Sequence, residues 1–412
     1  MDGLFDTAYR SAWWAFLAAA ALAWALTPAV RRLSIALGAV DAPDERRVHE
    51  TVTPRLGGLA MLIAILVATV AFVDWRDYVG LPLLNQHQLT VTLACALAIC
   101  LLGAIDDLLD MPWRVKLAGQ VLIAVAVVAI PAIWRPEGLR IGQAPLIIER
   151  LDLPFVPPFD MPLVLGIGLV VLWIVAVMNM MNFIDGVDGL AAGQSAIIGA
   201  TFAIIAASYL RQPVAVLAAA MSGASLGFLP HNWRKGGARI FMGDSGSMLL
   251  GFLLAVISVQ GVLKTTAAIS LVIPLTLLAV PILDTSFVVL KRLKHGVSVA
   301  HPDKWHLHHR LLNVGLSPRR VAATLWAWSG AMSAVALALR FVDYGNSKDW
   351  NGEGLFVLCF VIAGAVAVSV VLAYQLEIVK SRRVRQRNRD IAAQSAAEPT
   401  EPTSELPSSN HT

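Results

Sequence analysis

Charged residues are scarce in this chain. Of its 412 residues only 15% are Asp, Glu, Lys or Arg, whereas 57% are hydrophobic and the mean hydropathy is +0.68. A soluble domain of ordinary composition carries about 25% charged residues. The scarcity of charge therefore excludes a soluble globular protein and an array of soluble domains.

Cysteine is also rare, and its placement excludes two kinds of site. Three cysteines are present, all inside apolar blocks: Cys95, Cys100 and Cys359. Their spacing fits neither a zinc site nor a disulfide framework, so we expect small core residues. The first ten residues lack the basic region of a secretory signal peptide, and we expect the first apolar block to be a retained helix.

What the chain does contain is long apolar blocks separated by short polar gaps. About 20 apolar residues in a helix cross the hydrocarbon core of a bilayer. The blocks lack the alternation of barrel strands, so we expect an all-α integral membrane protein with about eleven transmembrane helices. The expected spans are 11–30, 56–73, 89–105, 117–134, 162–181, 190–210, 213–229, 247–263, 267–290, 321–342 and 354–376.

Positive charge is divided unequally between the two sides that these spans create. The side reached after the first span holds 23 of the 32 Lys and Arg residues. Cytoplasmic loops carry such an excess, which predicts an outside N-terminus and a cytoplasmic C-terminus. The same rule explains the pI of 9.1, so we expect no nucleic-acid partner. Residues 1–380 are the expected membrane domain with cytoplasmic catalytic loops, and 381–412 a basic, then low-complexity tail that we expect to be disordered.

The predicted cytoplasmic loops hold seven of the nine histidines and four polar motifs. The first motif begins with Asp106 and Asp107 at the end of the third span and continues through Asp110 to Lys116. If the helix continued, Asp106 and Asp110 would share a face and repel unless a cation lay between them. Adjacent carboxylates suit divalent metal binding or proton removal from a phosphate. The alternative is a solvated loop with basic counter-ions.

The second motif runs from Asn179 to Leu190 and contains Asn182, Asp185 and Asp188 in two Asp-Gly pairs. Asp-Gly is common in turns, so a sharp interhelical turn is the plain interpretation. A turn alone does not account for two carboxylates and two amides without a compensating base. We therefore interpret these side chains as ligands of a metal or a substrate.

The third motif is Phe241-Met-Gly-Asp-Ser-Gly-Ser247, just before the eighth span. Its glycines allow a ligand to approach the backbone closely, and Ser245 or Ser247 could cap the helix, whose N-terminus would favour phosphate. Asp244 could hold a Mg²⁺ ion, and upstream basic residues such as Arg239 would attract a diphosphate. The alternative is an ordinary helix cap flanked by cytoplasmic positive charge.

The fourth motif runs from His301 to Arg310 in a basic loop and contains His306, His308 and His309. A zinc site is one interpretation, but no cysteine and no clear fourth ligand accompany the histidines. Binding of phosphate or sugar through N–H donors is another, and a polar interfacial segment is the third.

Two further residues are candidates. Arg55 lies in Thr53-Pro-Arg-Leu-Gly-Gly58, which opens the second span and could form a closely packed loop. Asp284 lies about two turns inside the ninth span. An ionisable residue at that depth indicates function, and the alternative is a structural ion pair with Lys291 or Arg292.

Together the motifs place carboxylates, glycine loops and bases on one membrane face. This combination fits a metal-assisted reaction of phosphates, in which positioning and charge neutralisation dominate. A transporter would need ionisable residues near the middle of the membrane, and only Asp284 lies deep.

The motifs in this order resemble those of the polyprenyl-phosphate N-acetylhexosamine-1-phosphate transferases, over about residues 40–320. The resemblance is strongest to the branch that moves GlcNAc-1-phosphate (the WecA/TagO branch). The MraY branch, which moves phospho-MurNAc-pentapeptide, typically has three consecutive histidines, and here Leu307 interrupts them. Eleven spans and an outside N-terminus agree with this family.

The resemblance implies roles for residues and partners. It implies catalytic carboxylates at Asp106 and Asp107, and Mg²⁺ (or Mn²⁺) at Asp244 with Asn182 and Asp185. The implied substrate-binding residues are Asp188, Lys116, Arg239, His306, His308, His309 and Arg310. It further implies a UDP-sugar and a polyprenyl phosphate as substrates, a homodimer, and a bacterial inner membrane with the site facing the cytoplasm. Direct attack by the lipid phosphate and a two-step route through an aspartyl phosphate are both open.

Overall fold

The computed structural model describes most of the expected membrane domain. The described residues are 2–41, 52–75, 82–133, 146–148, 150–151, 159–261, 269–296, 306–343 and 351–371. The predicted tail 381–412 lies outside them, as does the part of the histidine motif from His301 to Trp305.

The described chain is helical apart from two short pairs of antiparallel strands. The helices are α1 (Asp2–Ala36), α2 (Gly57–Phe72), α3 (Pro82–Leu109), α4 (Trp113–Ile133), α5 (Leu163–Ile184), α6 (Leu190–Ser208), α7 (Gln212–Asn232), α8 (Gly243–Gly261), α9 (Ile269–Leu277), α10 (Ala279–Lys294), α11 (Leu307–Asn313) and α12 (Pro318–Phe341), followed by a helix at Gly352–Val371. The strands are β1 (Val40–Asp41) with β2 (Thr53–Pro54), and β3 (Arg150–Leu151) with β4 (Phe159–Asp160).

Nine of the described helices are long and apolar enough to cross a membrane. The chain is therefore an all-α membrane protein, as the sequence predicts. α2 is apolar but has only 16 residues. The span predicted over 267–290 is broken, because α9 and α10 meet at a bend of 74°. Pro274 and Pro281 lie on either side of the break, and proline both removes a helical N–H donor and clashes with the preceding turn.

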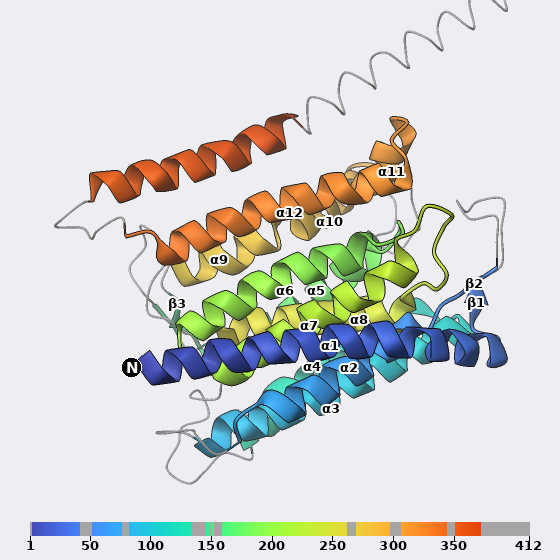
Figure 1. Cartoon of the computed structure of the whole chain (residues 1–412), viewed down its shortest axis with the longest axis horizontal. Coiled ribbons are helices and arrows are strands. Elements are labelled where there is room, and N and C mark those ends of the chain that lie inside the picture. The colour runs from blue at the N-terminus through green and yellow to red at the C-terminus, as the bar shows by residue number, and fades with distance from the viewer. Residues whose placement is uncertain are drawn as a thin grey trace, which may run out of the picture.

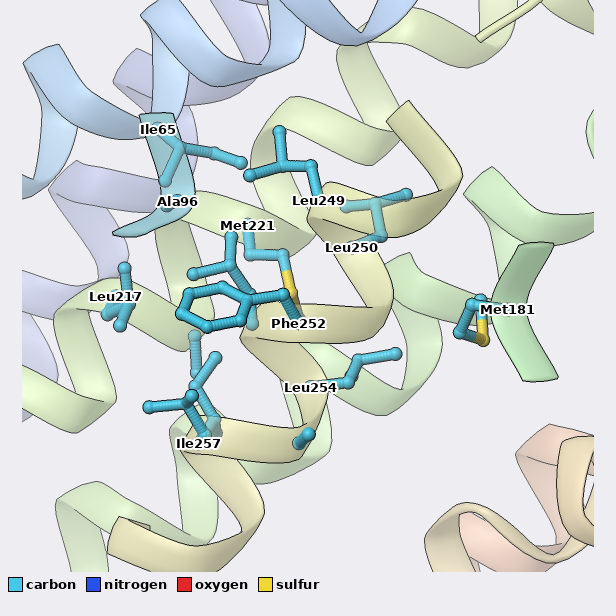
Figure 2. Packing of buried hydrophobic residues seen from close by; sticks show 14 of the residues in the cluster. Ile65, Ala96, Met181, Leu217, Met221, Leu249, Leu250, Phe252, Leu254 and Ile257 are labelled. Carbon is cyan, nitrogen blue, oxygen red and sulfur yellow. The ribbon is translucent and has the colours of Figure 1, made fainter. Parts of the chain in front are cut away.

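The helices lie side by side around α8, which packs against α3, α5, α2, α6 and α7 (Figure 1). Figure 2 shows how α8 fills the centre: Phe252 lies among side chains that include Met221 of α7 and Ile65 of α2. Because α8 is surrounded by other helices, these neighbours fix the position of its first turn.

Close approach of backbones holds α1 against α7. A Cβ added to Gly223 would lie 2.1 Å from the carbonyl oxygen of Phe16, and one added to Gly227 would lie 2.1 Å from that of Ala20. Small residues at such spacing allow membrane helices to pack closely, where dispersion forces and not water exclusion drive association.

The outer surface of the bundle is apolar, as lipid contact requires. The tryptophans Trp13, Trp14 and Trp24 of α1 are exposed. The helix 352–371 lies beyond α12 in Figure 1, and Trp328 of α12 donates from Nε1 to Ser369 Oγ at 2.9 Å. Cys95 and Cys100 are buried as predicted, whereas Cys359 on this outer helix is exposed, so its assignment to the core was wrong.

Candidate active site

The polar motifs meet at one end of the bundle, away from the N-terminus of α1. That end includes the β1–β2 pair and α11 (Figure 1). It also brings together the end of α3, the end of α5 and the first turn of α8, as the contacts below establish.

The first turn of α8 is held by a carboxylate from α3. The backbone N–H of Asp244 donates to Asp107 Oδ1 at 2.9 Å, and the N–H of Ser245 donates to Asp107 Oδ2 at 3.1 Å. Amides in the first turn have no acceptor within their own helix. Asp107 therefore acts as an N-cap supplied by another helix.

The prediction that a serine of the motif caps α8 was wrong. Ser245 Oγ donates to the carbonyl of Met242 at 3.0 Å, and Ser247 Oγ donates to the carbonyl of Gly243 at 3.0 Å. Both hydroxyls are thus turned toward carbonyl oxygens. The place that a phosphate would take at a free helix N-terminus is held by Asp107.

Glycines press three backbones together around this turn. We call Gly57, Gly58, Gly103, Gly243 and Gly246 the glycine cluster. A Cβ on Gly58 would lie 2.2 Å from the nitrogen of Gly246, and one on Gly103 would lie 2.5 Å from the carbonyl of Asp244. Gly243 has φ +68° and would place a Cβ 2.4 Å from Asp107 Oδ2. No side chain fits at Gly58 or Gly103 without moving the first turn of α8, and none fits at Gly243 without displacing Asp107.

Backbone hydrogen bonds join the loop around Arg55 to the segment before α8. The N–H groups of Gly57 and Gly58 donate to the carbonyls of Phe241 and Met242, each at 3.0 Å, and Phe241 N–H donates to Pro54 O at 2.7 Å. The predicted closely packed loop therefore exists. Its partner is the third motif.

A network of side chains lies beside this turn. Lys116 Nζ of α4 contacts Asp106 Oδ2 at 2.9 Å and also pairs with Asp244 Oδ2. Asn182 Nδ2 donates to Asp244 Oδ1 at 2.8 Å and to Ser247 Oγ at 2.9 Å. Asp244 thus connects the ends of three other helices, and we call Asp106, Lys116, Asn182 and Asp244 the Asp244 network.

Asp110 does not join Asp106 in a shared cation site. α3 ends at Leu109, Asp110 adopts a positive φ of 47°, and its side chain is 95% exposed. Asp106 Oδ1 instead accepts the backbone N–H of Met111 at 2.8 Å. The conditional pairing of the two carboxylates fails because the helix does not continue.

The turn between α5 and α6 brings Asp185 and Asp188 to the same end. Asp188 Oδ2 accepts the N–H of Ala238 at 3.0 Å, which ties the turn to the segment before α8. Burial raises the pKa of Asp185 well above its usual value, and neighbouring carboxylates raise it further. Those carboxylates belong to Asp244, Asp188 and Asp107. The acidic residues of three motifs therefore share one electrostatic environment.

The histidine motif docks onto this turn through α10. Asp284 Oδ2 pairs with His306 Nδ1 at 2.8 Å, and Asp284 Oδ1 accepts the N–H of Leu307 at 2.5 Å. The partner of the Asp284 carboxylate is thus a histidine. The alternative suggested by the sequence was a structural ion pair with Lys291 or Arg292. An ionised carboxylate only accepts, so Nδ1 of His306 carries the proton.

The rings of the motif pack on the second motif. His306 lies 5.6 Å from the ring of Phe183 and is stacked on His308 at 5.7 Å. A Cβ on Gly186 would lie 2.3 Å from His308 Nε2. We call Asp284, His306 and His308, with Phe183 and Gly186, the histidine cluster.

Burial of His308 changes its titration. The side chain of His308 is buried. Burial is the largest cause that lowers its pKa to about 3, and the nearby His309 is the second. His308 is therefore neutral at physiological pH and presents one donor and one acceptor.

Arg310 lies with its guanidinium 4.9 Å from the centre of the Phe287 ring.

Two predicted residues lie outside these contacts. Arg55 pairs with Asp41 and lies 3.8 Å from Asp110. Arg239 is exposed, and its backbone carbonyl accepts from Arg31 Nε at 3.1 Å. The structure gives Arg55 a place in the loop, and it places Arg239 at the surface.

Sequence reasoning missed Gly103, Phe183 and the tryptophans Trp233 and Trp326. Trp233 lies against Gly189, and Trp326 Nε1 donates to Leu190 O at 3.1 Å, so both support the start of α6. A glycine three residues before Asp106 was the available signal for Gly103. The tryptophans carried none, because isolated aromatic residues are common in membrane helices.

The donor set at this end consists of carboxylate and amide oxygens. Among the described residues, no three His, Cys, Asp or Glu side chains converge as a ready-made metal site. Mg²⁺ is commonly held by one or two carboxylates together with substrate phosphates. The oxygen donors around Asp244 fit that ion class, and the histidine cluster, which has a single carboxylate, does not resemble a zinc site.

Known proteins are similar in sequence to this chain over most of its length. Residues 89–262 match the family described as glycosyl transferase family 4. The chain is 36% identical over 377 residues to a decaprenyl-phosphate N-acetylglucosaminephosphotransferase of Mycolicibacterium smegmatis, which covers 84% of this chain and 86% of the relative. It is 35% identical over 346 residues to the enzyme of the same name in Mycobacterium tuberculosis, covering 79% and 82%.

A more distant relative is the undecaprenyl-phosphate alpha-N-acetylglucosaminyl 1-phosphate transferase of Yersinia pestis, 27% identical over 345 residues, with 81% of this chain and 85% of the relative covered. The matched residues 89–262 include the polar motifs that meet around Asp244. The chain belongs to glycosyl transferase family 4, in the branch of the undecaprenyl- and decaprenyl-phosphate N-acetylglucosamine-1-phosphate transferases.

Proposed function

We propose that this protein transfers GlcNAc-1-phosphate from UDP-GlcNAc to a polyprenyl phosphate, giving polyprenyl-diphospho-GlcNAc and UMP. Family membership supports the reaction class. The observation that carries the proposal is the Asp244 network, in which carboxylates, an amide and a lysine from four helices meet at one end of the bundle.

The network suits two phosphate substrates. Lys116 is a point charge that can pair with a phosphate oxygen once it releases Asp106 or Asp244. One of the two adjacent carboxylates, Asp106 or Asp107, supplies the base that takes a proton from the lipid phosphate. The lipid oxygen then forms a bond to the β-phosphorus, and the bond from that phosphorus to the oxygen of UMP breaks.

Asp244, Asn182 and Asp185 are the residues that would hold Mg²⁺, with Mn²⁺ as a substitute. The bound ion would neutralise charge on the diphosphate and on the departing UMP. Asn182 and Lys116 hold the Asp244 carboxylate at its two oxygens, so they orient it before any ligand arrives.

We assign recognition of the sugar nucleotide to the turn and the histidine cluster. The four residues of the segment that docks at the start of α11 are His306, His308, His309 and Arg310. Asp188 lies in the turn between α5 and α6, and Arg239 is exposed on the loop whose Ala238 N–H donates to Asp188. The buried neutral imidazole of His308 provides a donor and an acceptor that suit hydroxyl and amide groups of a sugar.

The topology is part of the proposal. We assign eleven membrane passages, counting α2 and the bent α9–α10 pair as one each, with the N-terminus outside. The positive charge of the loops then places the site at the cytoplasmic face of a bacterial inner membrane. A homodimer is the proposed assembly.

Transfer of phospho-MurNAc-pentapeptide is the competing reaction with the same chemistry. Leu307, which separates the histidines, favours GlcNAc-1-phosphate transfer. A transporter is disfavoured because the ionisable side chains of the site gather at one end of the bundle.

The deciding experiment measures UMP release by the purified chain with UDP-GlcNAc, a polyprenyl phosphate and Mg²⁺. We expect release that needs both lipid and metal, and a loss of at least about a thousandfold in Asp244→Ala, as for other electrostatic groups at a reacting phosphate. Release only with UDP-MurNAc-pentapeptide would move the substrate. No release with any UDP-sugar would overturn the proposal.

A second assay separates the direct and two-step routes. Exchange of labelled UMP into UDP-GlcNAc without lipid acceptor requires a covalent phosphoryl-enzyme intermediate. We expect no exchange, because direct attack needs the lipid before UMP leaves.

A further inference from the structure

We infer that the two adjacent carboxylates of α3 have different tasks: Asp106 works on the reacting groups, and Asp107 is a positioning residue that caps α8 and fixes Asp244. The inference deepens the proposed function, and its catalytic part rests on that function. The cap itself is a statement about the fold and is testable without any substrate.

The two side chains reach different parts of Asp244. Asp106 reaches the carboxylate of Asp244 through their shared partner Lys116. Asp107 reaches the backbone, with one oxygen on the N–H of Asp244 and the other on the N–H of Ser245. Only the first of these contacts involves charges that a phosphate can replace.

The position of Asp107 is enforced from the other side by Gly243. With its φ of +68° and no Cβ, Gly243 leaves the space that the Asp107 carboxylate occupies, since a Cβ would lie 2.4 and 2.7 Å from its two oxygens. A carboxylate enclosed in this way cannot rotate toward a substrate without uncapping α8.

Action of Asp107 as a base or nucleophile would therefore disconnect the turn that carries Asp244. Asp106 differs, because only its Oδ1 accepts a backbone N–H, that of Met111, whereas its Oδ2 faces Lys116 Nζ, a charge that an incoming phosphate can share.

The test compares Asp107→Asn, Asp107→Ala and Asp106→Asn in the detergent-solubilised full chain. Asparagine keeps one acceptor oxygen and so one of the two cap hydrogen bonds, whereas alanine keeps neither. We expect the Tm to decrease from wild type to Asp107→Asn and further to Asp107→Ala. We also expect Asp107→Ala to need more Mg²⁺ for the same Mg²⁺-induced rise in Tm.

Activity supplies the second readout. Asp107→Asn should retain UMP release within about tenfold of wild type at saturating Mg²⁺, because one cap hydrogen bond still holds the first turn of α8. Asp106→Asn should lose at least about a hundredfold, as expected for a general base. The inference is overturned if Asp107→Asn is as inactive as Asp106→Asn while its Tm and its Mg²⁺ response equal those of wild type, or if the asparagine and alanine variants have the same Tm.

If the Asp107 variants do not accumulate as folded protein, amide hydrogen exchange on the wild type decides. First-turn amides have no intrahelical acceptor, so protection of the Asp244 and Ser245 amides requires the cap, and exchange at the rate of a free peptide would contradict it. If the wild type releases no UMP from any UDP-sugar, the proposed function fails, whereas the Tm order and the protected amides would still support the cap.

Discussion

The glycine cluster and the histidine cluster hold the same site by different means. In the glycine cluster, backbones touch: Gly103 and Gly58 meet the first turn of α8 with no side chain between them. In the histidine cluster, side chains make every contact, through the Asp284–His306 pair and the stacked rings of His306 and His308. The first arrangement permits almost no adjustment, whereas the second can change with the rotamers of a few residues.

The difference agrees with the chemistry proposed for each part. The reacting phosphorus needs groups fixed to within a fraction of an ångström. A sugar nucleotide presents many hydroxyl and amide groups, and a side-chain surface can recognise them with smaller losses when one contact changes. The predictions below test this division, beginning with the largest expected effect.

Gly103→Ala should do the most damage. Its new Cβ would lie 2.5 Å from the backbone of Asp244, and displacement of a catalytic group by about 1 Å costs about a hundredfold in rate. UMP release should fall by at least that factor, and the Tm should fall as well. The matched control is Gly168→Ala on α5, where a Cβ meets nothing within 4 Å, and it should leave both values unchanged. If the two variants had the same activity and the same Tm, the backbone packing of the glycine cluster would not hold the site rigidly.

Asp284→Asn should act on substrate binding. The amide retains an acceptor for Leu307 N–H but loses the carboxylate that fixes the Nδ1 proton of His306. We expect the KM for the UDP-sugar to rise about tenfold with a smaller change in kcat, since one hydrogen-bonded group of several is disturbed. Thr285→Val is the control, because Thr285 Oγ1 has no hydrogen-bond partner in the described part of the chain. A loss confined to kcat would assign Asp284 to the chemical step.

The stability of the histidine cluster should depend on pH. Burial lowers the pKa of His308 to about 3, whereas an unfolded histidine titrates near 6.5. The unfolded state therefore binds the proton first as the pH falls below about 6.5, and stability is lost from there downward. At pH 5 the loss relative to neutral pH is about 2 kcal/mol.

His308→Gln should remove this contribution, so its Tm should fall less than that of wild type between pH 7.5 and pH 5. His295→Gln, at an exposed position on the C-terminal side of α10, serves as the matched control. Parallel Tm curves for wild type and His308→Gln would show that the imidazole is not held neutral by burial.

The smallest effect is expected at Arg319→Lys. The guanidinium of Arg319 lies 4.3 Å from the centre of the Trp233 ring, behind the start of α6. Lysine keeps the charge but cannot stack as a plane, so we expect a loss of about 0.5–1 kcal/mol, seen as a small decrease in Tm. Arg320→Lys at the neighbouring exposed position should have no effect. If Arg319→Lys and Arg320→Lys had the same Tm, the contact between Arg319 and Trp233 would not contribute to stability. The histidine cluster alone would then represent the side-chain contacts in this comparison.

The sequence predicts the helical membrane class and the motifs that meet, and the physical reason is simple. Apolar length determines spans, and chemistry-bearing residues stand out against an apolar background. The break between α9 and α10 was missed although Pro274 and Pro281 signalled it, because apolar length alone does not detect a bend. The count of eleven passages and their orientation stay predictions.

The sequence could not indicate which of two adjacent aspartates faces the substrate. Asp106 and Asp107 have the same chemistry, and their difference arises from the close approach of α8, which depends on Gly243 far away in the chain. The cap on α8 was likewise assigned to its own serines, because a cap supplied by another helix leaves no local pattern. Such contacts are tertiary and appear only when the helices are placed.

The backbone packing around Gly58, Gly103 and Gly243 has a consequence for antibiotic design. A compound that binds against a side-chain surface invites resistance, since one substitution can remove its contacts and leave the enzyme working. Gly58 and Gly103 are buried behind the turn that carries Asp244, and a side chain at either position would collide with that turn. A compound that contacts this turn therefore faces a surface that substitutions at these glycines cannot reshape without displacing Asp244, and variants that resist it and keep activity should be rare.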